Sequence, residues 1–147
     1  SNGQIVLSGL SSDIDKFIET LKTKKIKNIK LPVSAPFHCK LMDKATSIMR
    51  DKINNTNFEK PKNVIISNVT GSETQEIDKI KDLLIKQIES PVRWRESVIY
   101  MIKNGVTNFI EIGPGKVLSG LVKRIDKTIN VNTINKLEDL KDINLND

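Results

Sequence analysis

The chain contains very little of several residue types, and each scarcity excludes something. A single cysteine among 147 residues excludes an internal disulfide and is typical of a reducing compartment. Aromatic residues make up 4% of the chain, so its net charge of +6 lacks the aromatic platforms of most nucleic-acid binders. No apolar run approaches the length of a membrane span, and the first residues carry no signal-peptide pattern. We therefore expect neither a nucleic-acid nor a membrane partner, and interpret the lysines as a solvated surface.

Histidine also occurs only once, at His38, within the segment 31–42 (LPVSAPFHCKLM). The apolar run before it is predicted to be extended and to place the imidazole in the first turn of a helix. The positive end of the helix dipole favours an uncharged ring there, and an uncharged ring can accept a proton from a nucleophile. A lone histidine with a purely structural role at a helix start is the alternative.

The sequence lacks a recognisable nucleophile for that histidine. A catalytic serine on a strand-to-helix elbow needs the pentapeptide G-x-S-x-G, which does not occur. Neither Ser34 nor Ser67, Ser97 or Ser119 is flanked by the required glycines. Gly113-Pro114-Gly115 lies between a predicted strand and a predicted helix, but it fits neither the P-loop nor the G-x-G-x-x-G pattern, so we expect no nucleotide site.

Apolar periodicity and turn residues predict the secondary structure. Helices are expected after a cap at 11–13, from His38 to residue 53, at 77–88, from Ser90-Pro91 to Gly105, at 117–125 and from Leu137. The helix that begins at His38 is expected to bury a stripe of apolar residues, namely Leu41, Ala45, Ile48, Met49 and Ile53. Strands are expected at 4–7, 26–33, 64–66, 106–112 and 131–134, with 64–66 as a central parallel strand. Trp94 is expected in the core rather than as a ligand platform.

Four segments together resemble a known family. Ser34–His38 followed by Leu41-Met42 is similar to the catalytic-histidine segment of malonyl-CoA:acyl carrier protein transacylases. Residues 66–71 (ISNVTG), 87–101 (QIESPVRWRESVIYM) and 111–125 (EIGPGKVLSGLVKRI) also match, in the family's order. The matches extend over nearly the whole chain after residue 30, and four ordered matches are far more specific than one motif.

The resemblance implies an α/β fold, namely part of a parallel-sheet acyltransferase core with half of a ferredoxin-like small subdomain. Residues 1–33 would form the C-terminal half of that subdomain, and residues 34–147 the C-terminal part of the core. The nucleophilic serine, and the arginine that holds the malonyl carboxylate, would lie on polypeptide before residue 1. The chain is thus expected to resemble the C-terminal portion of the enzyme, with the missing N-terminal half as its partner, and to be inactive alone.

The implied function is transfer of malonyl from coenzyme A to acyl carrier protein in fatty acid biosynthesis, by a ping-pong mechanism. His38 would be the catalytic base and acid, and the backbone carbonyl of Gln87 would orient it. Phe37 and Asn68 would bind substrate, the Phe37 ring occupying the space that the extra methyl of methylmalonyl needs. No metal or separate cofactor is implied, because coenzyme A and phosphopantetheine arrive with the substrates. The expected location is the bacterial cytoplasm, or a plastid or mitochondrion in a eukaryote.

Several alternatives stay open at this stage. A related thioester hydrolase could use the same core, or the chain could be a catalytically silent fragment that docks acyl carrier protein. The lysines could attract an acidic carrier protein rather than being merely solvated. Gln87 could be an ordinary helix-end residue, and Cys39 is expected to be a packed thiol, since no base or cation adjoins it in sequence.

Overall fold

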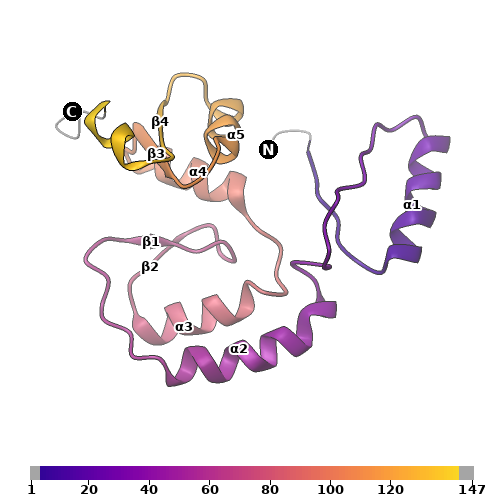
Figure 1. The fold of residues 1–147 in the computed structure, drawn as a ribbon, viewed down its shortest axis with the longest axis horizontal. Helices are drawn as coiled ribbons and strands as arrows, with labels where there is room; N and C mark the ends of the chain where they lie inside the picture. Colours follow the sequence, from indigo (N-terminus) through magenta and orange to yellow (C-terminus); the bar gives the residue numbers. More distant parts are fainter. Residues whose placement is uncertain (1–3, 143–147) are drawn as a thin grey trace. The chain divides into compact units, whose positions relative to one another are not determined.

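The computed structural model describes residues 4–142, which fall into two compact units (Figure 1). One unit comprises residues 5–93, and the other comprises residue 4 with residues 94–142. The predicted boundary after residue 33 falls inside the first unit and stays a prediction. Within the described residues, every helix is too short or too polar to cross a membrane.

The first unit begins with α1, which spans Ser11–Thr23. Leu10 is its N-cap, so Ser11 lies inside the helix instead of capping it, and Lys25 ends it in a left-handed conformation at φ 55°. The strands predicted at 4–7 and 26–33 are wrong, since neither segment is a strand. A strand needs a second backbone to pair with, and neither segment finds one within the described chain. Ile5 and Ile29 consequently remain 86% and 76% exposed.

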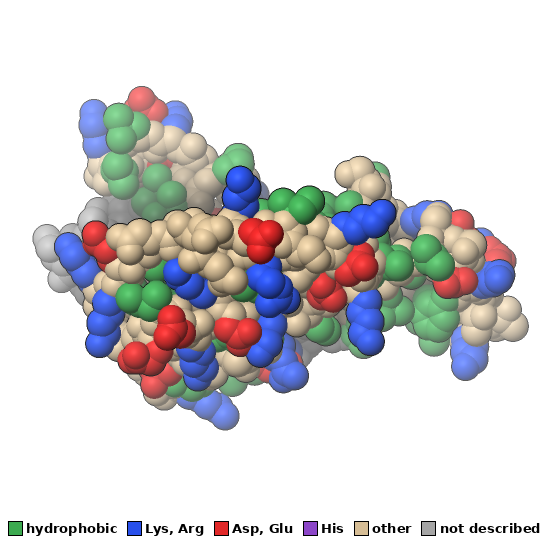
Figure 2. Space-filling model, turned by 90° about the horizontal axis from the view of Figure 1, so that it is seen from below, with side chains coloured by type: hydrophobic (Ala, Val, Ile, Leu, Met, Phe, Trp, Pro, Cys, Tyr) green, Lys and Arg blue, Asp and Glu red, His purple; other side chains and the backbone are tan. Residues whose placement is uncertain are grey.

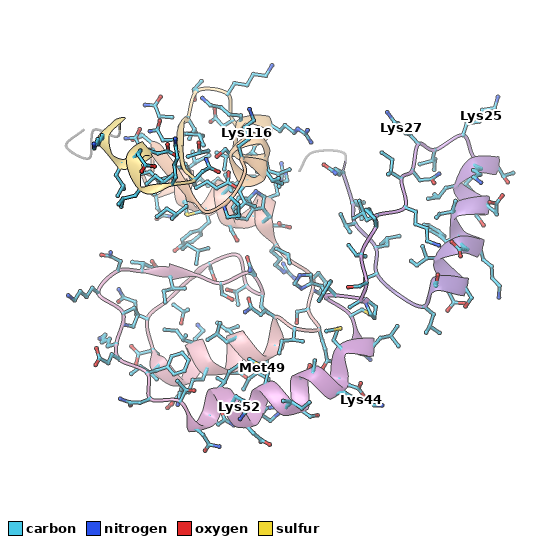
Figure 3. All side chains as sticks on the ribbon, in the orientation of Figure 1. Lys25, Lys27, Lys44, Met49, Lys52 and Lys116 are labelled. Carbon is cyan, nitrogen blue, oxygen red and sulfur yellow. The ribbon has the colours of Figure 1, made fainter. Side chains whose placement is uncertain are left out.

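Two helices lie side by side in the middle of this unit (Figure 1). A 3-10 turn, η1 (Lys40–Met42), leads into α2 (Asp43–Asn55), which packs against α3 (Ile77–Lys86). Only Ile53 of the predicted stripe on α2 is buried, whereas Ile48 is 63% exposed. The predicted stripe is therefore mostly wrong, and the other buried residue of α2 is Thr46, which the stripe did not include. Lys44, Met49 and Lys52 also project from α2 (Figure 3).

The strand predicted at 64–66 exists as β1 (Ile65–Ile66), but its pairing was predicted wrongly. It pairs antiparallel with β2 (Glu73–Thr74), which the sequence did not predict. Gly71 adopts φ 68°, so the chain turns back at once and places its own return strand beside β1. A hairpin partner thus takes an edge that was expected to pair with a parallel strand.

The second unit contains the parallel pair of strands. These are β3 (Asn108–Ile112) and β4 (Asn130–Ile134), with Phe109 opposite Val131 in the register. Helix α5 (Val117–Ile125) connects the strands and packs on both, and η2 (Leu137–Asp142) follows β4. The predicted α/β class with a parallel sheet is therefore confirmed.

Helix α4 (Trp94–Lys103) supplies the centre of this unit's core. Val98 is fully buried and clusters with Val122 and Ile129. Trp94 packs against the same cluster, as predicted, and Gly105 at φ 88° follows the helix end. The predicted start at Ser90-Pro91 is too early, since the helix begins at Trp94; the Arg93 N–H before it bonds to the carbonyl of Asn68.

Charges of both signs lie on the face of the molecule that Figure 2 shows. In the face shown in Figure 2, lysine and arginine side chains alternate with acidic and apolar ones, and no broad face of one sign forms there. This distribution is what a solvated, lysine-rich surface looks like.

Candidate active site around His38

His38 lies in a tight turn between the segment at 31–36 and η1. The Phe37 N–H bonds to the Ala35 carbonyl at 3.0 Å, and the Cys39 thiol donates to the Pro36 carbonyl at 3.2 Å. His38 itself has φ 61°, a left-handed conformation that histidine adopts more readily than most residues but that still costs about 1–3 kcal/mol. The prediction that His38 lies in the first helical turn is wrong, since it precedes the 3-10 turn.

The imidazole of His38 is exposed and makes one defined polar contact. Its Nδ1 lies 3.0 Å from the backbone carbonyl oxygen of Gln87. A carbonyl can only accept, so Nδ1 must carry the hydrogen in this contact. In a neutral ring that leaves the lone pair on Nε2, the nitrogen available to take a proton from another group.

The sequence explains why this carbonyl is free to accept. Gln87 is the C-cap of α3, with φ −63° and ψ −19°, and carbonyls at a helix end lack a helical donor. The residue four positions later is Pro91, which has no N–H to offer. The Ser90 N–H bonds to the Lys86 carbonyl at 3.0 Å. The Gln87 carbonyl is therefore left for His38.

Asn68 joins the same group of contacts from the turn after β1. Its side-chain nitrogen lies 3.4 Å from the side-chain oxygen of Gln87, and its backbone carbonyl accepts from the Arg93 N–H at 2.9 Å. Phe37, next to His38 in sequence, has 50% of its surface exposed. Hydrogen bonds thus link three of the predicted site residues, His38, Gln87 and Asn68. The fourth, Phe37, adjoins His38 in the sequence. The catalytic and binding roles of all four stay predictions.

A small cavity of about 90 Å³ lies beside Gln87 and Asn68. It can hold a few water molecules but not a coenzyme A thioester. The buried hydroxyl of Thr74 borders it without a hydrogen-bond partner. Its walls are mainly apolar and come from β1, β2 and α3: Ile65, Ile66, Ser67, Asn68, Thr74, Ile80, Leu83, Leu84 and Gln87.

Three of the candidate serines, Ser67, Ser97 and Ser119, are hydrogen-bonded or buried within their own units. Ser119 donates its hydroxyl to the Glu111 carboxylate at 2.6 Å, and the Ser67 hydroxyl accepts from the Val69 N–H at 3.1 Å. Ser97 is 4% exposed within α4.

Glu111 is a residue whose role the sequence reasoning missed. Its carboxylate accepts the backbone N–H groups of Leu118 at 3.1 Å and Ser119 at 2.7 Å, so it fills the N-terminus of α5. The hydrogen bond from the Ser119 hydroxyl, with those from the backbone, lowers the pKa of Glu111 below its ordinary value of 4.5. An acidic residue six positions before a helix is the signal that could have indicated this cap. These amides, at the helix end where a phosphate would bind, are thus already occupied. Among residues 4–142 no cluster of acidic, histidine or cysteine side chains could hold a metal ion.

Comparison with known proteins addresses the family. No family model matches the chain. A curated malonyl CoA-acyl carrier protein transacylase from Staphylococcus aureus is 40% identical over 146 residues, which is 99% of this chain and 47% of the relative. The crystal structure of an acyl carrier protein S-malonyltransferase from Vibrio cholerae is 38% identical, with a TM-score of 0.85 over 92% of this chain and 45% of that one.

The resemblance to malonyl-CoA:acyl carrier protein transacylases is confirmed. A second similar structure is a malonyl-transacylase in complex with its type II PKS acyl-carrier protein, 32% identical, with a TM-score of 0.84 over 90% of this chain and 43% of that chain. The chain spans about half the length of the transacylases it matches, and the matched half is their C-terminal part.

Proposed function

We propose that this chain is the histidine-bearing part of a malonyl transferase, which moves malonyl from coenzyme A to acyl carrier protein in fatty acid biosynthesis. The observation that carries the proposal is the 3.0 Å contact between His38 Nδ1 and the Gln87 carbonyl, which prepares Nε2 as a base. The names of the similar proteins support the substrates, and the similar transacylase solved with an acyl-carrier protein supports the acceptor.

In the proposed reaction, the nucleophilic serine is supplied by polypeptide outside this chain. His38 Nε2 takes the serine proton as the serine oxygen attacks the malonyl thioester, and then gives that proton to the departing coenzyme A thiol. The malonyl group is left as a serine ester. The pantetheine thiol of acyl carrier protein then gives its proton to His38 and attacks the ester, and the serine oxygen recovers the proton.

The partner of His38 bears on the choice of acceptor. A neutral carbonyl stabilises the imidazolium less than a carboxylate does, so the resulting base is weaker than in a triad with an acidic residue. A weaker base favours attack by a thiol, which loses its proton readily, over attack by water. This favours transfer over hydrolysis.

The other assignments are part of the same proposal. Phe37 is proposed to limit the acyl pocket to malonyl, whereas substrate binding by Asn68 stays a prediction because its observed contacts are with protein. We propose the N-terminal half of the enzyme as the structural partner, residues 1–33 and 34–147 as parts of its two subdomains, and a cytoplasmic location.

A fusion protein tests the activity. The part of the Staphylococcus aureus relative that this chain does not match is joined to the N-terminus of the chain, and transfer of labelled malonyl from malonyl-CoA to acyl carrier protein is measured. We expect transfer, and a loss of about 10²–10⁴-fold in His38→Ala, the usual contribution of a general base. The adjacent Cys39→Ala variant is the matched control and should retain transfer.

Other outcomes identify the alternatives. Release of free malonate without an acceptor at a rate that equals or exceeds transfer would indicate a hydrolase. A folded fusion that binds acyl carrier protein but transfers nothing would indicate a silent docking fragment. Transfer that is unchanged in His38→Ala would contradict the proposed mechanism.

A further inference from the structure

Asn68 holds both ends of the segment 87–93, which connects α3 to Trp94. At one end, its side-chain nitrogen lies 3.4 Å from the Gln87 side-chain oxygen. At the other end, its backbone carbonyl accepts from the Arg93 N–H at 2.9 Å. The carbonyl that receives His38 Nδ1 belongs to the first residue of this segment.

The turn that carries Asn68 is itself firmly held. The Ser67 N–H bonds to the Ser72 carbonyl at 3.0 Å, and the Gly71 N–H bonds to the Ser67 carbonyl at 2.8 Å. The Ser67 hydroxyl, on a residue 8% exposed, accepts the Val69 N–H at 3.1 Å. The position of Asn68 is therefore well defined, and its two contacts position the ends of the 87–93 segment.

The backbone after Gln87 makes short-range hydrogen bonds at the helix end: the Ile88 N–H lies 3.3 Å from the Ile85 carbonyl, and the Ser90 N–H bonds to the Lys86 carbonyl at 3.0 Å. The Gln87 N–H also keeps a helical hydrogen bond, to the Leu83 carbonyl at 2.9 Å. Pro91 removes the donor that would otherwise align its carbonyl with the helix axis. Asn68 adds to these bonds by contacting the side chain of Gln87, the residue that bears the carbonyl.

We infer that Asn68 is a positioning residue that acts through Gln87: it aims the Gln87 carbonyl at His38 and so keeps the imidazole proton on Nδ1 and the lone pair on Nε2. This inference rests on the proposed function for its catalytic consequence, but the effect on the imidazole is independent of it. It also gives Asn68 a role that differs from the substrate contact expected from the sequence.

The single histidine makes a direct test practical. The full chain is labelled with ¹⁵N-histidine, and the ring ¹⁵N shifts are recorded at about pH 9, where an ordinary imidazole is neutral. We expect mainly the Nδ1–H tautomer. In Asn68→Leu, the ratio of Nδ1–H to Nε2–H should fall about fivefold, the effect of losing one ordinary hydrogen bond. Asn63→Leu, at an exposed asparagine of the same unit, is the matched control and should leave the ratio unchanged.

Substitutions of Gln87 approach the same contact from its other side. Gln87→Leu keeps the backbone carbonyl but removes the partner of Asn68, so it should lower the ratio as much as Asn68→Leu does, and the double variant should lower it no further. Gln87→Glu keeps an acceptor for Asn68 and should restore most of the ratio. If Asn68→Leu fails to fold, the pair Gln87→Leu and Gln87→Glu still decides the question.

Kinetics of the fusion protein distinguish positioning from substrate binding. For Asn68→Leu we expect kcat to fall about fivefold with KM for malonyl-CoA unchanged. A raised KM with unchanged kcat, an unchanged tautomer ratio in a folded variant, or additive losses in the double variant would each overturn the inference. If the ratio responds as expected but the wild-type fusion transfers no malonyl, then the proposed function is wrong while the positioning role stands.

Discussion

Two glycines of the second unit should respond in opposite ways to the same added methyl group. Gly113, in the turn after β3, has φ 135°, a conformation that L-residues rarely adopt, whereas Gly120 lies in the middle of α5. A Cβ at either position would meet no atom within 4 Å of the described chain. Steric clashes therefore contribute to neither substitution, and only the backbone conformation decides the outcome.

The magnitudes follow from those conformations. Gly113→Ala should lower the free energy of unfolding by about 1–3 kcal/mol, because alanine strains a backbone at this φ. Gly120→Ala should raise it by about 0.5–1 kcal/mol, since alanine loses less backbone entropy than glycine in a helix interior. The two variants should thus differ by roughly 1.5–4 kcal/mol.

Trp94 provides the assay. It is the only tryptophan, and it packs against the Val98, Val122 and Ile129 cluster, so its fluorescence reports unfolding of this unit in urea. With a slope of about 1–3 kcal/mol per M, the midpoints should be separated by about 1 M urea. Equal urea midpoints for Gly113→Ala and Gly120→Ala would refute the assignment of the turn conformation at Gly113.

Two further predictions concern pH and specificity. Because hydrogen bonds lower the pKa of Glu111 in the folded state, its carboxylate stabilises the fold fully above the unfolded value near 4.5, and this stabilisation is lost as the pH falls through the lowered folded value. Urea unfolding between about pH 7 and pH 3 should therefore show a smaller acid-induced loss in Glu111→Gln than in wild type; an identical loss would contradict the cap. In the fusion protein, Phe37→Ser should admit methylmalonyl-CoA and lower the preference for malonyl by about 10–100-fold, as expected for one methyl group; unchanged selectivity would exclude Phe37 as the determinant.

The fold was predictable where the pattern and the partner lie close together in sequence. Helix α5 and strands β3 and β4 form one local strand–helix–strand unit, and their expected ranges match the observed ones closely. The predictions failed where pairing depends on another backbone: residues 26–33 have a strand-like sequence but no strand beside them. The β1 strand was recognised, but its partner β2 is only two residues long and too short to give a pattern.

The candidate site was predictable to a different degree. His38 and Gln87 were found through the resemblance, because sequence spacing alone cannot show that residues 49 positions apart lie 3.0 Å apart. The polar cap of α5 by Glu111 was missed because the carboxylate comes from the preceding strand and not from the usual N-cap position. The left-handed turn at His38 contains no glycine that would indicate it in the sequence, so the helix start was predicted too early.

The contacts around His38 indicate which groups of the proposed mechanism this chain would supply and which would come from the part that carries the serine. His38, its acceptor Gln87 and the anchoring Asn68 all lie within residues 5–93, and their hydrogen bonds require no residue from elsewhere. The tautomer of the base is therefore set before any serine arrives. What this unit leaves open is apolar surface, at Ile29 and Ile48 among others, which is what a second protein segment would bury. In the proposed mechanism, docking of a serine-bearing part would bring one hydroxyl to Nε2, where the contact with Gln87 leaves the lone pair.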